Sequence, residues 1–262
     1  MASWTVRYAS EPGNPARANE DYFTERNGVA VLLDGAGSLV DLDSGCIHGV
    51  QWFVQTLADD LVDVAGDRGR ALTDALGEAI ERTAAAHRVT CDLSNPNSPT
   101  STVVVVRLAG SAVEYLVLAD STLIYGKPQP WTVVTDTRIE LVGHAGISIQ
   151  ARAQHMERLA HVRNHTGGFW VAGPQPEAAA HSYTGAVPVD QVHQIALLSD
   201  GAARLVDKFQ LADWETVMRR LSAGGPGWLL SQIRNAEDAD PYAIRWPRSK
   251  LHDDATVAII DL

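Results

Sequence analysis

The stretch VAVLLDGAGS, residues 29–38, places a carboxylate at the end of an apolar segment. Five apolar residues in a row run into Asp34, and Gly35 then allows a sharp turn of the backbone. A short apolar run bounded by turn residues is typical of a strand that is buried on both faces. The same arrangement returns in IALLSDGAA, residues 195–203, around Asp200 and Gly201.

Acidic residues stand at the ends of several predicted strands. A buried carboxylate is costly unless it is paired or bound to a metal. Carboxylates that converge without a matching set of Lys or Arg favour hard divalent cations, Mg²⁺ or Mn²⁺, over zinc. A single Asp-Gly pair is more often a simple turn, so the interpretation depends on the whole set, which is Glu20, Asp21, Asp34, Asp200 and Asp253.

Apolar periodicity predicts the other elements of the chain. Helices are expected at 46–64, 70–88, 148–165, 212–224 and 227–236, and strands at 4–10, 101–108, 112–120, 122–126, 131–136, 167–173, 192–200 and 255–262. Strands do not alternate singly with helices, which argues against a doubly wound parallel sheet. We therefore expect an α+β fold, a four-layer α/β/β/α sandwich of two antiparallel sheets flanked by helix pairs. Because no linker divides the chain, residues 1–262 are expected to form one domain.

Charge and composition narrow the class of protein. The net charge of −11 argues against a surface for nucleic acid or for an anionic membrane. No apolar run approaches the ~18 residues that span a bilayer, and the first residues lack the pattern of a signal peptide. We expect a soluble, cytoplasmic protein that binds neither nucleic acid nor membrane. The two cysteines, Cys46 and Cys91, are expected to be reduced, and their spacing, even with His48 nearby, is not that of a zinc site.

Six short motifs, taken together, resemble the metal-dependent protein phosphatase family of type 2C, including its bacterial members. Each motif is weak alone, but their order over residues 19–261 is specific. The resemblance implies the sandwich fold and hydrolysis of phosphoserine and phosphothreonine in a protein or peptide substrate, with two or three Mn²⁺ or Mg²⁺ ions. The motifs are NED at 19–21, DGAGS at 34–38, STVVVV at 101–106, LADS at 118–121, SDG at 199–201 and DDATV at 253–257.

The resemblance also implies roles for the residues that match these motifs. A metal-bridging hydroxide would attack phosphorus in line, without a covalent phosphoenzyme. Asp34 would bridge two metals, and the carbonyl oxygen of Gly35 would be a further ligand. The remaining metal ligands would be Asp200 and Asp253, the pair Glu20 and Asp21, which binds metal or orients metal-bound water, and Asp120, which holds a third metal in bacterial members.

The chain departs from the family pattern at several positions. The family usually places an Arg four residues before the Glu of the first motif, where it binds phosphate. Here Arg17 lies three residues before Glu20 and is the nearest candidate, with Arg7 a weaker one. The frequent GDSR is ADST here, so that Arg is lost. Ala36 stands where many members carry His, and Asp254 where Asn is usual.

Two further points stay open at this stage. The segment 140–170 is a candidate for a flap-like region over the site, and its four histidines are expected to be surface or helix residues rather than metal ligands (His144, His155, His161 and His165). The leading hypothesis is an active phosphoprotein phosphatase. The alternatives are a pseudophosphatase or regulatory binding module with the same fold, and a phosphatase for small phosphorylated molecules.

Overall fold

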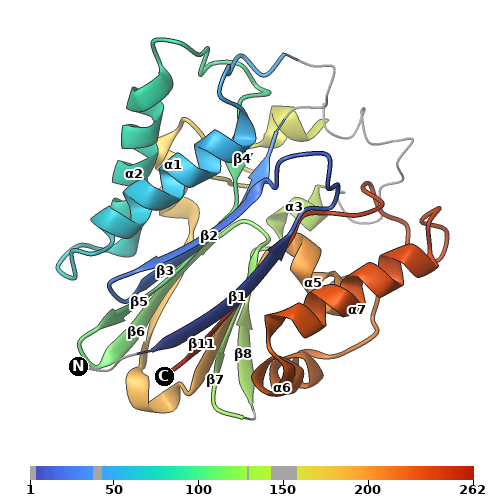
Figure 1. Cartoon of the computed structure of the whole chain (residues 1–262). Coiled ribbons are helices and arrows are strands. Elements are labelled where there is room, and N and C mark those ends of the chain that lie inside the picture. The colour runs from blue at the N-terminus through green and yellow to red at the C-terminus, as the bar shows by residue number, and fades with distance from the viewer. Residues whose placement is uncertain (1–3, 38–42, 129, 143–157) are drawn as a thin grey trace.

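Two antiparallel β-sheets pack face to face in the computed structural model, which describes residues 4–37, 43–128, 130–142 and 158–262 (Figure 1). Sheet 1 has the strand order β1–β11–β10–β7–β8, and sheet 2 the order β2–β3–β5–β6–β9, with β4 paired to β3. The strands of sheet 1 are β1 (Thr5–Glu11), β7 (Thr122–Gly126), β8 (Trp131–Val134), β10 (Gln194–Leu198) and β11 (Ala255–Asp261). Those of sheet 2 are β2 (Asp21–Arg26), β3 (Val29–Ala36), β4 (Thr100–Ser101), β5 (Val103–Ala109), β6 (Ala112–Leu118) and β9 (Tyr183–Pro188).

Helices cover the outer face of each sheet (Figure 1). On sheet 2 lie α1 (Gly49–Val64) and α2 (Leu72–His87). On sheet 1 lie α5 (Asp200–Asp207), α6 (Trp214–Gly224) and α7 (Pro226–Ala239). A short helix, α3 (Arg138–Leu141), follows β8, and two 3₁₀ segments, η2 (Pro176–His181) and η3 (Val189–Gln191), flank β9. The α+β class and the four-layer sandwich of antiparallel sheets are confirmed.

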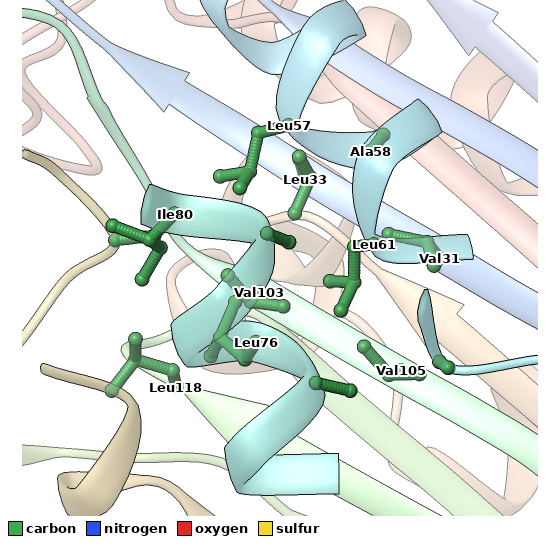
Figure 2. Packing of buried hydrophobic residues seen from close by; sticks show 14 of the residues in the cluster. Val31, Leu33, Leu57, Ala58, Leu61, Leu76, Ile80, Val103, Val105 and Leu118 are labelled. Carbon is green, nitrogen blue, oxygen red and sulfur yellow. The ribbon is translucent and has the colours of Figure 1, made fainter. Parts of the chain in front are cut away.

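The apolar runs in the strands arise because each sheet is covered on both faces. In β3, Val31 and Leu33 pack against α1 and α2, as Figure 2 shows for the cluster that they share with Leu57 and Leu76. The alternate residue Leu32 points into the core between the sheets. Successive side chains of a strand point to opposite faces, so a strand between two apolar layers needs apolar residues at every position.

Several predicted elements differ from those observed. Helix α1 begins at Gly49, three residues later than predicted, and both Gly45 and Gly49 adopt positive φ angles that interrupt a helix. The predicted strand 167–173 is wrong, since only isolated bridges occur there, Arg163 with Phe169 and Ser101 with Ala172.

The predicted elements do not include β9, α5, α3, η2 or η3. Strand β9 lies at the edge of sheet 2, where partial exposure removes the apolar pattern that would reveal it. The predicted strand 192–200 ends at Leu198, and helix α5 begins at Asp200.

Part of the predicted helix 148–165, together with His144 and His155, lies outside the described residues. Within the described part, residues 158–162 are helical, and His161 and His165 are exposed, as predicted. In the described ranges of the chain, no helix combines the length and the apolar character that crossing a membrane requires.

Candidate metal centre

Asp21 and Asp34 face each other across neighbouring strands of sheet 2. The antiparallel register of β2 and β3 pairs these two residues directly. Asp34 has the same parity in β3 as Ala30 and Leu32, which belong to the core between the sheets. Side chains directly opposite on neighbouring strands lie on the same face. The two carboxylates therefore continue the inter-sheet face at the end of β3.

Polar contacts from the STVVVV motif hold the backbone of Asp34. Its carbonyl oxygen accepts hydrogen bonds from Ser101 Oγ (3.0 Å) and the Thr102 N–H (2.9 Å), and its N–H donates to Thr102 Oγ1 (3.2 Å). The next residue, Gly35, donates its N–H to the carbonyl oxygen of Glu20 (3.0 Å). A Cβ at Gly35 would lie 2.4 Å from Val50 Cγ1, so only glycine fits beneath α1.

Sheet 1 brings Asp200 and Asp253 to the same place. The Asp200 N–H, in the first turn of α5, donates to Asp34 Oδ2 (3.2 Å) across the two sheets. Asp253 lies two residues before β11, which is the neighbour of β10. A Cβ at Gly201 would lie 1.9 Å from the carbonyl oxygen of Asp254, so glycine permits the close approach of the SDG and DDATV motifs.

The electrostatics of this cluster favour a bound cation. Both carboxylate oxygens of Asp21 are buried and have no hydrogen-bond partner. Burial raises the pKa of Asp21 to about 7; the nearby Ser199 and Thr256 hydroxyls lower it in part, and the charges of Asp254 and Asp200 add smaller increases. Burial and the charges of Asp21 and Asp200 also raise the pKa of Asp34 well above its ordinary value. Crowded carboxylates with unsatisfied oxygen atoms are the donor set that Mg²⁺ and Mn²⁺ prefer, and such cations would remove this repulsion.

Two basic residues not singled out in the sequence bind Asp253. Lys250 Nζ lies 2.5 Å from Asp253 Oδ1, and Arg204 lies 2.5 Å from Oδ2. Burial raises the pKa of Asp253, but these two cations outweigh it and hold the pKa below its ordinary value. Arg204 also pairs with the fully buried Glu237 (2.8 Å), which in turn contacts Arg234 (2.7 Å).

Lys250 is also close enough to the other carboxylates for their charges to affect its pKa. Burial would lower its pKa, but the charges of Asp253, Asp200 and Asp34 outweigh burial and raise it. The sequence gives no signal for this role, because Lys250 lies in an irregular segment whose path only the fold determines.

Asp120 follows β6 by two residues and lies close enough to Asp200 for the charge of that residue to affect it. Burial and the charge of Asp200 raise its pKa to about 7, with smaller contributions from Asp136 and Glu140. The preceding Ala119 has a φ of +68°, a left-handed conformation that is strained for a residue with a Cβ. Local strain at a carboxylate beside the cluster is typical of functional positions.

The candidate phosphate-binding arginines are not brought into the cluster by any contact among the described residues. Arg17 is exposed in the turn before β2, where its N–H donates to the Asn14 carbonyl oxygen (2.9 Å). Arg7 pairs instead with Asp261 (3.0 Å), where β1 meets the end of β11. Ala36 is exposed at the end of β3.

Asp254 holds the turn that contains Glu20 in place through two hydrogen bonds. Its Oδ1 accepts the Gly13 N–H (2.7 Å), and its Oδ2 accepts the Glu20 N–H (2.6 Å). A carboxylate can accept at both oxygen atoms, whereas an amide would turn its NH₂ group against one of the two donors. The departure from the usual Asn therefore has a structural explanation in this chain.

Comparisons with known proteins identify the family and the fold. The family model described as protein phosphatase 2C matches residues 17–229. Curated protein sequences give no match. Among solved structures, the serine/threonine phosphatase PstP/Ppp of Mycobacterium tuberculosis is similar with a TM-score of 0.63 at 14% identity, covering 99% of this chain and 98% of that chain.

Two further structures have the same fold. PppA of Pseudomonas aeruginosa, described as a regulatory component of T6SS, has a TM-score of 0.61 at 17% identity, over 99% of this chain and 98% of that chain. The catalytic domain of PstP in complex with two manganese ions has a TM-score of 0.59 at 16% identity, over 99% of both chains. Since the family model covers most of the sequence, the chain belongs to the protein phosphatase 2C family.

Proposed function

We propose that this protein is a metal-dependent phosphatase that hydrolyses phosphoserine and phosphothreonine in proteins or peptides. The observation that carries the proposal is the burial of Asp21 beside Asp34 and Asp200, where the Ser199 and Thr256 hydroxyls are near its carboxylate but leave both oxygens without a hydrogen bond of good geometry. Within the cluster, Lys250 and Arg204 pair with Asp253, so the buried carboxylates of Asp21 and Asp34 remain costly unless cations bind to them. Family membership supplies the reaction class.

The carboxylates of this cluster would hold two or three Mn²⁺ or Mg²⁺ ions. On sheet 2 the ligands of these ions would be Asp34, the Gly35 carbonyl oxygen and Glu20. Asp120 is assigned to a third ion. When bound, such ions supply a water-derived nucleophile and neutralise the phosphoryl oxygens.

The protein's own contribution is to hold these oxygen atoms in place. The Asp200 N–H orients one oxygen of Asp34, and Arg204 orients one oxygen of Asp253. Ser101 and Thr102 fix the backbone at Asp34. Ligands fixed before the reaction need little reorganisation during it, which favours turnover. Arg17, exposed in the turn before β2, is assigned to bind the phosphoryl group.

The decisive experiment measures phosphate release from phosphoserine and phosphothreonine peptides with Mn²⁺, with Mg²⁺ and with excess EDTA. Activity should require added metal and vanish with the chelator. Asp34→Asn should reduce turnover by orders of magnitude while the circular dichroism spectrum stays unchanged. Asp190→Asn, at an exposed position between β9 and β10, is the matched control and should retain activity. Full activity in EDTA or in Asp34→Asn would contradict the proposal.

The same assay separates the other two hypotheses. Hydrolysis of p-nitrophenyl phosphate without release from any phosphopeptide would favour a phosphatase for small molecules. Metal binding by calorimetry without turnover on either substrate would favour a pseudophosphatase or regulatory binding module. The single domain over residues 1–262 and the cytoplasmic location stay predictions.

A further inference from the structure

A second group of potential metal ligands lies outside the carboxylate cluster, where the start of α1 meets the end of α2. Cys46 precedes α1, His87 is the last residue of α2, and Cys91 follows four residues later. The Cys91 and Cys46 sulfur atoms lie 3.5 Å apart, and Cys46 Sγ lies 3.6 Å from His87 Nδ1. All three ligand atoms lie within 4.8 Å of one another. His87 is buried, and both cysteines are half-buried.

The two shortest distances within this group, 3.5 Å between the sulfur atoms and 3.6 Å between Cys46 Sγ and His87 Nδ1, are close to those of a tetrahedral zinc site. With zinc–sulfur bonds of about 2.3 Å and zinc–nitrogen bonds of about 2.05 Å, tetrahedral angles place two sulfur ligands about 3.8 Å apart and sulfur and nitrogen about 3.6 Å apart. A disulfide would require about 2.05 Å between the sulfur atoms. The spacing therefore suits two thiolates that share a central ion better than two bonded sulfur atoms.

The surroundings hold the ligands in place. The Asp92 N–H donates to the Gly45 carbonyl oxygen (2.8 Å), which joins the two chain segments that carry the cysteines. The His87 ring lies against Trp52, with ring centroids 5.0 Å apart. The Thr90 hydroxyl lies 3.7 Å from Cys91 Sγ and donates to the His87 carbonyl oxygen (3.1 Å), which links the two residues at the end of α2.

We propose that Cys46, His87 and Cys91 bind one Zn²⁺ ion through three protein ligands, with the fourth position open to solvent. Thiolate and imidazole ligands select zinc, whereas the oxygen ligands of the carboxylate cluster select Mg²⁺ or Mn²⁺. The two centres therefore discriminate between metals by ligand type. This inference is independent of the proposed phosphatase activity.

The position of the site gives the ion a structural consequence. It would tie the segment before α1 to the end of α2, and Val50 in the first turn of α1 packs directly over Gly35 and Gly37. A fixed start of α1 therefore supports the end of β3, where Asp34 lies. At a zinc concentration a hundred times the dissociation constant, the melting temperature should rise by about 5–10 °C.

Cobalt provides the direct test, because a thiolate ligand to Co²⁺ produces a near-ultraviolet charge-transfer band that carboxylate ligands do not. The full chain is stripped of metal, kept reduced, and titrated with CoCl₂ and then with ZnCl₂. We expect one equivalent of Co²⁺ to produce the band and Zn²⁺ to abolish it. Cys91→Ser should lose the band and the zinc-dependent rise in melting temperature, whereas Asp34→Asn, in the carboxylate cluster, should keep both.

A second measurement, of thiol alkylation, uses the chain without substitutions, so it does not depend on whether Cys91→Ser folds. Bound Zn²⁺ should slow alkylation of both thiols by iodoacetamide at least tenfold. The proposal is overturned if the reduced protein shows no band and no protection of its thiols. It is also overturned if Cys91→Ser folds and keeps the band, or if the thiols form only a disulfide and never bind metal once reduced.

Discussion

Replacing Lys250 with Met should tighten the binding of Mn²⁺ to the carboxylate cluster. Lys250 Nζ lies 2.5 Å from Asp253 Oδ1, so a metal ion that takes this oxygen atom has to displace the ammonium group. Met keeps most of the apolar stem of Lys. Asp253 also keeps its partner Arg204 (2.5 Å), so the substitution does not leave a bare buried carboxylate.

The size of the effect follows from the ion pair. A hydrogen bond between charged groups contributes about 1.5–3 kcal/mol, and solvent screening of a side chain that is 35% exposed reduces this to about 1–2 kcal/mol. Because 1.4 kcal/mol corresponds to a tenfold change, the dissociation constant for Mn²⁺ should fall about 5- to 30-fold.

Calorimetric titration of the metal-free protein with MnCl₂ at fixed ionic strength measures this change. Lys127→Met makes the same substitution at an exposed position in the turn between β7 and β8 and should leave the dissociation constant unchanged. The Mn²⁺ concentration for half-maximal activity should fall in parallel in Lys250→Met. An unchanged or weaker affinity in Lys250→Met would refute the argument that this ammonium competes with metal.

Four further outcomes are expected. Asp120→Ala should lower turnover yet leave two ions bound, as counted by metal analysis; three ions in a crystal of that variant would refute its assignment to a third site. Ala36→His should narrow the preference for p-nitrophenyl phosphate over phosphoserine peptides, because a general acid at this exposed position can raise the rate of a reaction with a poor leaving group about 10²–10⁴-fold. An unchanged ratio of turnover on the two substrates would argue against a missing general acid at residue 36. Arg204→Leu should lower the free energy of unfolding by about 3 kcal/mol in urea titrations, because it removes the cation between two buried carboxylates, whereas the exposed Arg220→Leu should change it little. Asp254→Asn should cost about 1–2 kcal/mol in the same assay, since an amide cannot accept from both Gly13 and Glu20 with its two terminal atoms; equal stability would contradict that explanation.

Local pattern in the sequence was enough to predict most of the fold. The apolar runs around Val31 and Leu197 indicated strands covered on both faces, and the order of strands and helix pairs indicated two antiparallel sheets. The predictions of secondary structure were wrong where tertiary packing, and not the local sequence pattern, determines the structure. Strand β9 is held by its pairing with β6 rather than by an apolar sequence, and residues 167–173 are apolar without a partner strand.

The sequence by itself also identified the acidic residues at strand ends, because a carboxylate next to a buried strand and a glycine is a local signal. Their convergence depends on the tertiary structure, since Asp34 and Asp200 belong to different sheets and meet only when the sheets pack. Lys250 is paired with Asp253 by the path of an irregular segment, which no periodicity encodes. Likewise, the spacing of Cys46 and Cys91 excluded a zinc site in the sequence, yet the packing of α1 on α2 brings both sulfur atoms to His87. The sequence determined which charged residues and cysteines stand at the ends of helices and strands. Long-range packing alone decided which of these residues are in contact. Contacts between distant segments depend on how the buried apolar faces pack, and the local spacing of residues does not encode them.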